Sequence, residues 1–168
     1  MQTVPVPAPR TVSIVSLVVA LVAVVTAAAV VAVTLLRGGS TTAGRFAGEN
    51  PQTAAKKLAV DVTTYDYRTL DAGTQHVLAE TTGDAKASYT RTSAQLHDTI
   101  LKQQASATAA AVGTGLVSGA GNKAVVLVAL RQHFASASGA RDDKAAVQLT
   151  LTRAATSAPW VVSVIQPL

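Results

Sequence analysis

The hydrophobic positions of this chain follow three different patterns, and each pattern predicts a different kind of structure. The first is an uninterrupted run at Thr11–Leu36, 26 residues without a charged side chain, bounded by Arg10 and Arg37. At about 1.5 Å per residue, a helix of this length measures about 39 Å, whereas the hydrocarbon core of a bilayer is about 30 Å thick. We therefore predict a single transmembrane helix over residues 11–36.

Three other interpretations fit this apolar run less well. A cleaved signal peptide has a shorter apolar region of about 7–15 residues, although the small residues Ala27–Ala29 resemble a cleavage site. A buried helix of a soluble domain would need protein on every side, and a surface helix would need a polar face. Basic residues lie on both sides of the run, so charge alone leaves the orientation of the helix open.

The second pattern has the period of an α-helix. Asn50-Pro51 is a typical start, with Asn50 as the N-cap and proline as the first helical residue. Apolar residues then recur at offsets of three and four, at Leu58, Val62 and Tyr65, which predicts a helix ending near Arg68. Two more helices are predicted, at 69–83, capped by Thr69 and ended by Gly83, and at 84–104. The buried stripe of the last one is Ala85, Tyr89, Thr92, Leu96 and Ile100.

The third pattern is that of β-strands. Val147, Leu149 and Leu151 alternate with polar residues, and the apolar run at 124–134 is typical of a central strand. Further strands are predicted at 107–118 and 160–165, with a turn at 119–122 and a loop at 136–143. Three helices followed by four antiparallel strands predict an α+β domain, with the helices packed on one face of a curved sheet.

The same patterns divide the chain into four parts. Residues 1–10 alternate prolines and form a solvated tail, which we expect on the cytoplasmic side; 11–36 is the transmembrane helix. Residues 37–50 are rich in glycine, serine and threonine and form a flexible linker. Residues 51–168 form one domain, which is large enough to bury a single core.

Composition excludes several kinds of partner and chemistry. Thirteen of the fourteen basic residues and all nine acidic ones lie after residue 36, so that part has a net charge of +4. The charges are scattered rather than gathered in a stripe, so no nucleic-acid partner is expected. The chain has no cysteine, which excludes disulfides and thiolate metal sites.

The candidate chemical groups give no catalytic, cofactor-binding or metal-binding site. We expect His76, His97 and His133 to be exposed, none of them preassembled into a metal site by a partner on its own helix. Asp66 could meet His76 or His133 as an acid–base pair only through an accident of the fold. The glycines at 113–121 suggest bulges or turns rather than a phosphate-binding loop, and Asp142-Asp143 suggests a solvated loop rather than a calcium site. The chain is therefore not expected to be an enzyme.

The strongest local cluster is the segment 64–71, Thr-Tyr-Asp-Tyr-Arg-Thr-Leu-Asp. One interpretation is a structural staple, in which Tyr65 packs on the sheet and Asp66 pairs with Arg68 or caps the next turn. The other is a docking surface for a partner, with Tyr67 and Arg68 as anchors. Asp71 would stabilise the start of the second helix through its dipole.

An N-terminal anchor, a spacer and a helix that ends in this segment resemble the Mce-associated membrane proteins of actinobacteria. The similarity continues through Thr81-Thr82-Gly83, Tyr89, the strand Ala124–Leu130 and the closing Trp160–Ser163. The resemblance implies an NTF2-like, cystatin-like fold in a domain on the outer face of the cytoplasmic (inner) membrane, anchored by a single pass. It also implies a non-catalytic role beside Mce lipid-import complexes.

Two classes of function follow. The first is an anchored accessory or scaffold subunit of Mce-type lipid import, whose partners are the bilayer and Mce complex or permease proteins. The second is a module that binds lipid in an apolar cavity. The same fold also serves as an assembly factor in other envelope-spanning machines, so the fold alone does not select among them.

Overall fold

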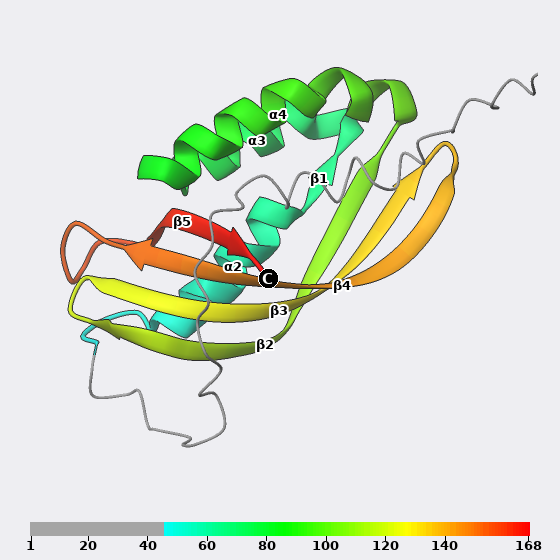
Figure 1. Cartoon of the computed structure of the whole chain (residues 1–168). Helices are drawn as coiled ribbons and strands as arrows, with labels where there is room; N and C mark the ends of the chain where they lie inside the picture. The colour runs from blue at the N-terminus through cyan, green and yellow to red at the C-terminus, as the bar shows by residue number, and fades with distance from the viewer. Residues whose placement is uncertain (1–45) are drawn as a thin grey trace, which may run out of the picture. The chain divides into compact units, whose positions relative to one another are not determined.

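The computed structural model describes residues 46–168 (Figure 1). The predicted tail at 1–10, the transmembrane helix at 11–36 and the linker as far as residue 45 lie outside the described residues. Between residues 46 and 168, no helix combines the length and the apolar character needed to cross a membrane.

The described part has three helices followed by four long strands. The helices are α2 (Pro51–Thr63), α3 (Leu70–Ala79) and α4 (Gly83–Gln103). A two-residue strand, β1 (Tyr65–Asp66), and a 3₁₀ turn, η2 (Tyr67–Thr69), connect α2 to α3. The long strands are β2 (Ser106–Ala120), β3 (Lys123–Ser136), β4 (Gly139–Thr152) and β5 (Val161–Pro167).

All five strands form one antiparallel sheet in the order β1-β2-β3-β4-β5, so that neighbours in sequence are neighbours in space. The sheet is strongly curved, and the helices lie over one of its faces (Figure 1). The predicted α+β class, with helices on one face of a curved antiparallel sheet, is confirmed.

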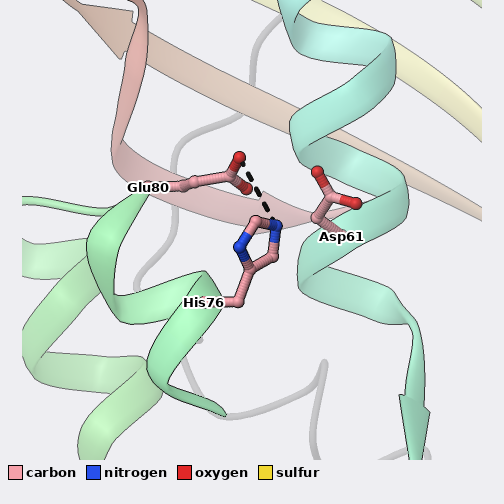
Figure 2. A group of neighbouring side chains, drawn as sticks. All are labelled: Asp61, His76 and Glu80. Atoms are coloured by element: carbon pink, nitrogen blue, oxygen red, sulfur yellow. Dashed lines mark ion pairs between the residues drawn. The ribbon is translucent and has the colours of Figure 1, made fainter. Parts of the chain in front are cut away.

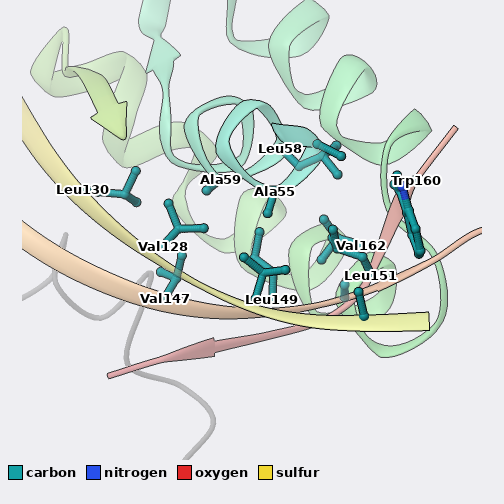
Figure 3. Packing of buried hydrophobic residues seen from close by; sticks show 14 residues of the cluster. Ala55, Leu58, Ala59, Val128, Leu130, Val147, Leu149, Leu151, Trp160 and Val162 are labelled. Atoms are coloured by element: carbon teal, nitrogen blue, oxygen red, sulfur yellow. The ribbon is translucent and has the colours of Figure 1, made fainter. Parts of the chain in front are cut away.

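The main core lies between α2 and the sheet. Alternate residues of the two central strands are buried: Val126, Val128 and Leu130 on β3, and Leu149 and Leu151 on β4. Helix α2 covers them with the mostly small residues of one stripe, Ala54, Ala55, Leu58 and Ala59 (Figure 3). Alanines let the helix axis approach the sheet closely, and each buried leucine or valine contributes about 1.5–3 kcal/mol.

A second, smaller core lies where α4 turns into β2. Leu70, Ile100 and Ala105 form it, and the partly buried Tyr65, Tyr67 and Leu96 pack against them. Ala85 and Ile100 of the predicted α4 stripe are buried, while Tyr89, Thr92 and Leu96 are half-buried.

Residues 46–50, which the sequence pattern places in the linker, contact the domain. The rings of Phe46 and Trp160 meet edge to face, 5.8 Å apart, and the indole Nε1 of Trp160 donates to the carbonyl of Glu49 at 3.0 Å. The guanidinium of Arg153 covers the other side of the contact, 4.3 Å from the indole centroid. Trp160 therefore fixes the point at which the chain enters the domain.

The first helix ends at Thr63, so its predicted end near Arg68 is wrong. Thr63 Oγ1 donates to the carbonyl of Ala59, and Thr64 has extended backbone angles. Tyr65 then pairs with Ala107 of β2 instead of continuing the helical stripe. Consecutive β-branched threonines weaken a helix at this point, and strand pairing with β2 satisfies the backbone that leaves it.

The boundary between the second and third helices also differs from the prediction. Helix α3 stops at Ala79, and Gly83 begins α4 rather than ending α3. Between them the chain bonds to β5: Val162 donates to the carbonyl of Glu80 and accepts from the amide of Thr82. Thr69 lies at the N-cap position of α3, but its side chain makes no capping hydrogen bond.

The predicted loop at 136–143 is wrong as well. Ser136 and Gly139 pair across a tight hairpin, and β4 begins at Gly139. The polar residues at 141–144 belong to the first half of β4, which is exposed or half-buried. Side chains that need not face a core show no alternation, so the pattern at 147–152 detects only the buried half of the strand.

Candidate functional site

Four ionisable side chains meet where α2 passes the end of α3. Lys57 and Asp61 stand one helical turn apart on α2, and His76 and Glu80 stand one turn apart at the end of α3. We call these four residues the α2–α3 cluster. Figure 2 shows Asp61 facing His76 and Glu80 across the gap between the two helices.

The distances within the cluster are short. Lys57 Nζ lies 2.7 Å from Asp61 Oδ2 and also donates to Glu80 Oε1. His76 Nε2 lies 3.7 Å from the same Glu80 oxygen. Hydrogen bonds to Asp61 and to Glu80 raise the pKa of Lys57 above its ordinary value. The ammonium thus serves both carboxylates.

Glu80 is the most buried member of the cluster. Its side chain is 19% exposed, compared with 24% for Asp61, 59% for His76 and 60% for Lys57. Backbone hydrogen bonds to Val77 and Val162 hold Glu80 at the end of α3. Its second oxygen, Oε2, is buried and accepts no hydrogen bond from the described residues. An unsatisfied carboxylate oxygen of this kind is costly and calls for an explanation.

The cluster contains a set of possible metal ligands. One oxygen each from Asp61 and Glu80 and one imidazole nitrogen of His76 lie within 4.8 Å of one another. Imidazole and carboxylate are both ligands of zinc and related divalent ions.

Two of these three residues could have been found in the sequence. The expectation that no histidine has a carboxylate partner on its own helix is wrong for His76, because Glu80 follows it by four residues. Asp61 carries no such signal, since it meets the pair only because the fold brings the end of α3 close to α2.

The predicted segment 64–71 contains β1 and η2 and extends into the first turn of α3. Arg68 makes two side-chain hydrogen bonds to the carboxylate of Asp66, at 2.6 and 3.0 Å, and its backbone amide donates to the same group. These bonds from Arg68 lower the pKa of Asp66 to about 2. Tyr67 donates its amide to the carbonyl of Ala105, and burial raises the pKa of the Tyr65 hydroxyl. The Arg68 side chain is 70% exposed.

Asp71 lies in the first turn of α3, as predicted, and its exposed carboxylate lies 3.1 Å from His97 Nε2 of α4. The second nitrogen of His97 lies 3.3 Å from Asp98. Hydrogen bonds to Asp98 and Asp71 raise the pKa of His97. The link joins α3 to α4 at the surface.

The structure pairs Asp66, His76 and His133 with separate neighbours rather than with one another. Asp66 holds Arg68, His76 lies beside Glu80, and His133 Nδ1 lies 2.7 Å from Asp142 on the exposed side of the β3–β4 hairpin.

Three of the glycines at 113–121 lie at a bulge or a turn, as predicted, whereas Gly115 pairs regularly with Leu127. A β-bulge precedes Gly113, and a second one lies between Leu116 and Ser118. Gly119 and Gly121 have positive φ angles around the turn from β2 to β3.

Several solved structures share this fold, type IV secretion system proteins among them. An IcmL-like protein from Legionella pneumophila superposes with a TM-score of 0.61 at 14% identity, over 72% of this chain and 94% of that one. The periplasmic domain of DotI gives 0.59 at 16% identity, over 70% and 94% of the two chains. CagV, a VirB8 homologue from Helicobacter pylori, gives 0.56 at 10% identity, over 70% and 95%. At these identities the similarity concerns the fold alone.

No curated protein matches the chain in sequence. A family profile does match, over residues 12–166, and its description is "Uncharacterized protein Rv1363c/MT1408-like". The match covers nearly the whole described domain and most of the apolar run that precedes it. The chain therefore belongs to the Rv1363c/MT1408-like family.

Proposed function

We propose that this protein is a membrane-anchored, non-catalytic accessory subunit of an envelope transport complex, and that the complex is an Mce-type lipid importer. In this proposal residues 11–36 cross the cytoplasmic membrane, 37–45 act as a linker, and the domain lies on the outer face. The domain contributes contacts that hold other subunits in place.

The observation that carries the proposal is the fold. The same curved sheet with helices on one face occurs in the periplasmic domain of DotI and in other type IV secretion proteins. The DotI domain is periplasmic, and the other two proteins belong to type IV secretion systems. The apolar run of 26 residues ahead of the domain supports an anchor of the same kind. The Mce assignment rests on the sequence resemblance.

The interior of the domain supports contacts rather than chemistry. The space between α2 and the sheet is filled by alanine, valine and leucine side chains (Figure 3). The histidines and carboxylates described above lie at the surface or at its margin. A packed interior of this kind also gives no support to the alternative of a lipid-binding module.

The exposed side chain of Arg68 is the candidate anchor for a partner. Its guanidinium lies 5.7 Å from the ring centroid of the neighbouring Tyr67 and is held by Asp66. Arginine and tyrosine held in a fixed geometry are typical of interface hot spots. We propose that the segment 64–71 combines both interpretations: Tyr65 and Asp66 fix the local fold, and Arg68 faces the partner.

The test is co-purification of the full-length protein from its native membrane in mild detergent, with subunits identified by mass spectrometry. We expect Mce or permease subunits with the wild type and at least tenfold less of them with Arg68→Ala, a loss typical of a hot spot of about 1.4 kcal/mol or more. Lys144→Ala, an exposed basic residue of β4, is the matched control.

Each outcome separates the alternatives. Recovery of subunits of another envelope machine would replace the Mce assignment and retain the accessory role. A protein that carries no envelope subunit under these conditions would contradict both. Equal recovery with Arg68→Ala would remove the segment 64–71 as the docking surface.

A further inference from the structure

We propose that Asp61, His76 and Glu80 bind a zinc ion that links α2 to the end of α3. The inference concerns a site of this chain and is independent of the proposed role in transport.

The donor set and its spacing fit zinc. Tetrahedral zinc with ligands at about 2.1 Å places the donor atoms about 3.4 Å from one another. His76 Nε2 and Glu80 Oε1 are already 3.7 Å apart, and all three donors lie within 4.8 Å of one another. Small rotations of the Asp61 and His76 side chains therefore bring the three donor atoms to the separations that zinc requires. Three protein ligands leave the fourth position to water or to a group from a partner.

The buried oxygen of Glu80 is a second, independent observation. Oε2 is shielded from solvent and accepts no hydrogen bond within residues 46–168. A metal ion bound to Oε2, alone or together with Oε1, would give this oxygen a partner and would thereby offset the cost of burying it.

The charge of the cluster also favours a divalent cation. One ammonium, that of Lys57, faces the two carboxylates of Asp61 and Glu80. The two carboxylates and the one ammonium together carry a net charge of −1. Lys57 occupies the position between the carboxylates that a cation prefers, but its side chain is 60% exposed and can turn outward to solvent. Zinc binding then replaces the single positive charge of the Lys57 ammonium by the two positive charges of the zinc ion.

The other histidine–carboxylate contacts lack these features. His97 lies between Asp71 and Asp98, whose side chains are 90% and 83% exposed. Within residues 46–168, the one carboxylate that contacts His133 is that of Asp142. Both are contacts of solvated surface groups, and they serve as internal controls.

The experiment is a calorimetric titration of ZnCl₂ into full-length, untagged, chelator-treated protein in detergent, repeated on variants. The wild type is expected to bind one zinc ion with a saturable isotherm and to unfold at a higher temperature when zinc is present. His76→Gln and Glu80→Gln are expected to weaken binding at least about tenfold, since changes outside the ligand shell alone reach that size. His133→Gln, the matched control, should bind as the wild type does.

Lys57→Met tests the displacement of the ammonium. Because the lysine has to leave, this variant should bind zinc at least as tightly as the wild type. Weaker binding by Lys57→Met would overturn the displacement.

Loss of binding in His133→Gln, or unchanged binding in His76→Gln, would place the zinc elsewhere and overturn the site. Lack of saturable binding by the wild type would do the same. Circular dichroism checks that each variant is folded; His76 is exposed enough for its variant to decide the matter if Glu80→Gln unfolds.

Discussion

The two apolar cores of this domain differ in how completely they are enclosed. Beneath α2, strand residues such as Val126, Val128 and Leu149 have no exposed surface, and helix and sheet both contribute to the packing. Where α4 turns into β2, the core consists of Leu70, Ile100 and Ala105 with partly buried neighbours. The first core determines whether the domain folds, whereas the second determines how α3 and the end of α4 are held.

Two polar side-chain contacts lie at the surface near the smaller core. The ion pair of Asp66 and Arg68 and the contact of Asp71 with His97 both lie beside the smaller core. Exposed pairs contribute little each, about 0–1 kcal/mol at most. We therefore expect α3 and the end of α4 to open locally before the sheet does. A partner that binds at the surface of this region therefore has the fewest packing contacts to disrupt.

The largest expected effect is in the main core. Leu149→Ala removes a side chain that is fully buried between α2 and the sheet, and should reduce the free energy of unfolding by about 2–5 kcal/mol. Denaturant unfolding followed by circular dichroism measures it. Val112→Ala, at a position that is 60% exposed, should change stability by less than about 0.5 kcal/mol. Similar losses for both variants would contradict the assignment of this core.

Ile100→Ala tests the smaller core. We expect a cost of about 2 kcal/mol, at the lower end for such substitutions, because the thin packing around Ile100 can collapse into the space. Hydrogen exchange should accelerate in α3 and the end of α4 and stay unchanged in α2. Leu101→Ala, the exposed neighbour on the same helix, should leave both measurements unaltered. Faster exchange across the whole sheet would mean that the two cores unfold together.

Gly119→Ala examines the turn that sets the register of β2 on β3. A Cβ at Gly119 would lie 2.6 Å from the carbonyl oxygen of Lys123 and 2.7 Å from the Cα of Ala124, at a φ of +144°. Since both contacts are backbone, the variant should lose more than about 1 kcal/mol. Gly115→Ala has open space around it and an ordinary φ, so thermal unfolding should show little change or a small gain.

The smallest effect concerns pH and the pair of Asp66 and Arg68. The pKa of Asp66 is lowered to about 2 from its ordinary 3.8, so the carboxylate stabilises the folded state above 3.8. That contribution is lost as the pH falls from 3.8 through about 2. An NMR titration of Arg68→Gln should show the pKa of Asp66 returning toward 3.8, while Asp71→Asn should not change it. A pKa near 3.8 in the wild type would contradict the pair.

The sequence pattern was sufficient to predict the elements whose signal lies within a short segment of the chain. Asn50 caps α2 by accepting from the amide of Gln52, as the Asn-Pro start predicts. The apolar run of β3, the alternation in β4 and the stripe of α4 follow from burial, which the sequence records directly. The order of helices before strands then left few ways to form one layered domain.

Tertiary structure alone decided the rest. Tyr65 leaves the helix because β2, some forty residues later, offers it a strand to pair with. Asp61 reaches His76 and Glu80 because the fold brings the end of α3 close to α2, and no periodicity encodes that meeting. Periodicity reports which face of an element is buried, whereas a site made from two elements depends on their distance and rotation. These are fixed only when the whole core is packed.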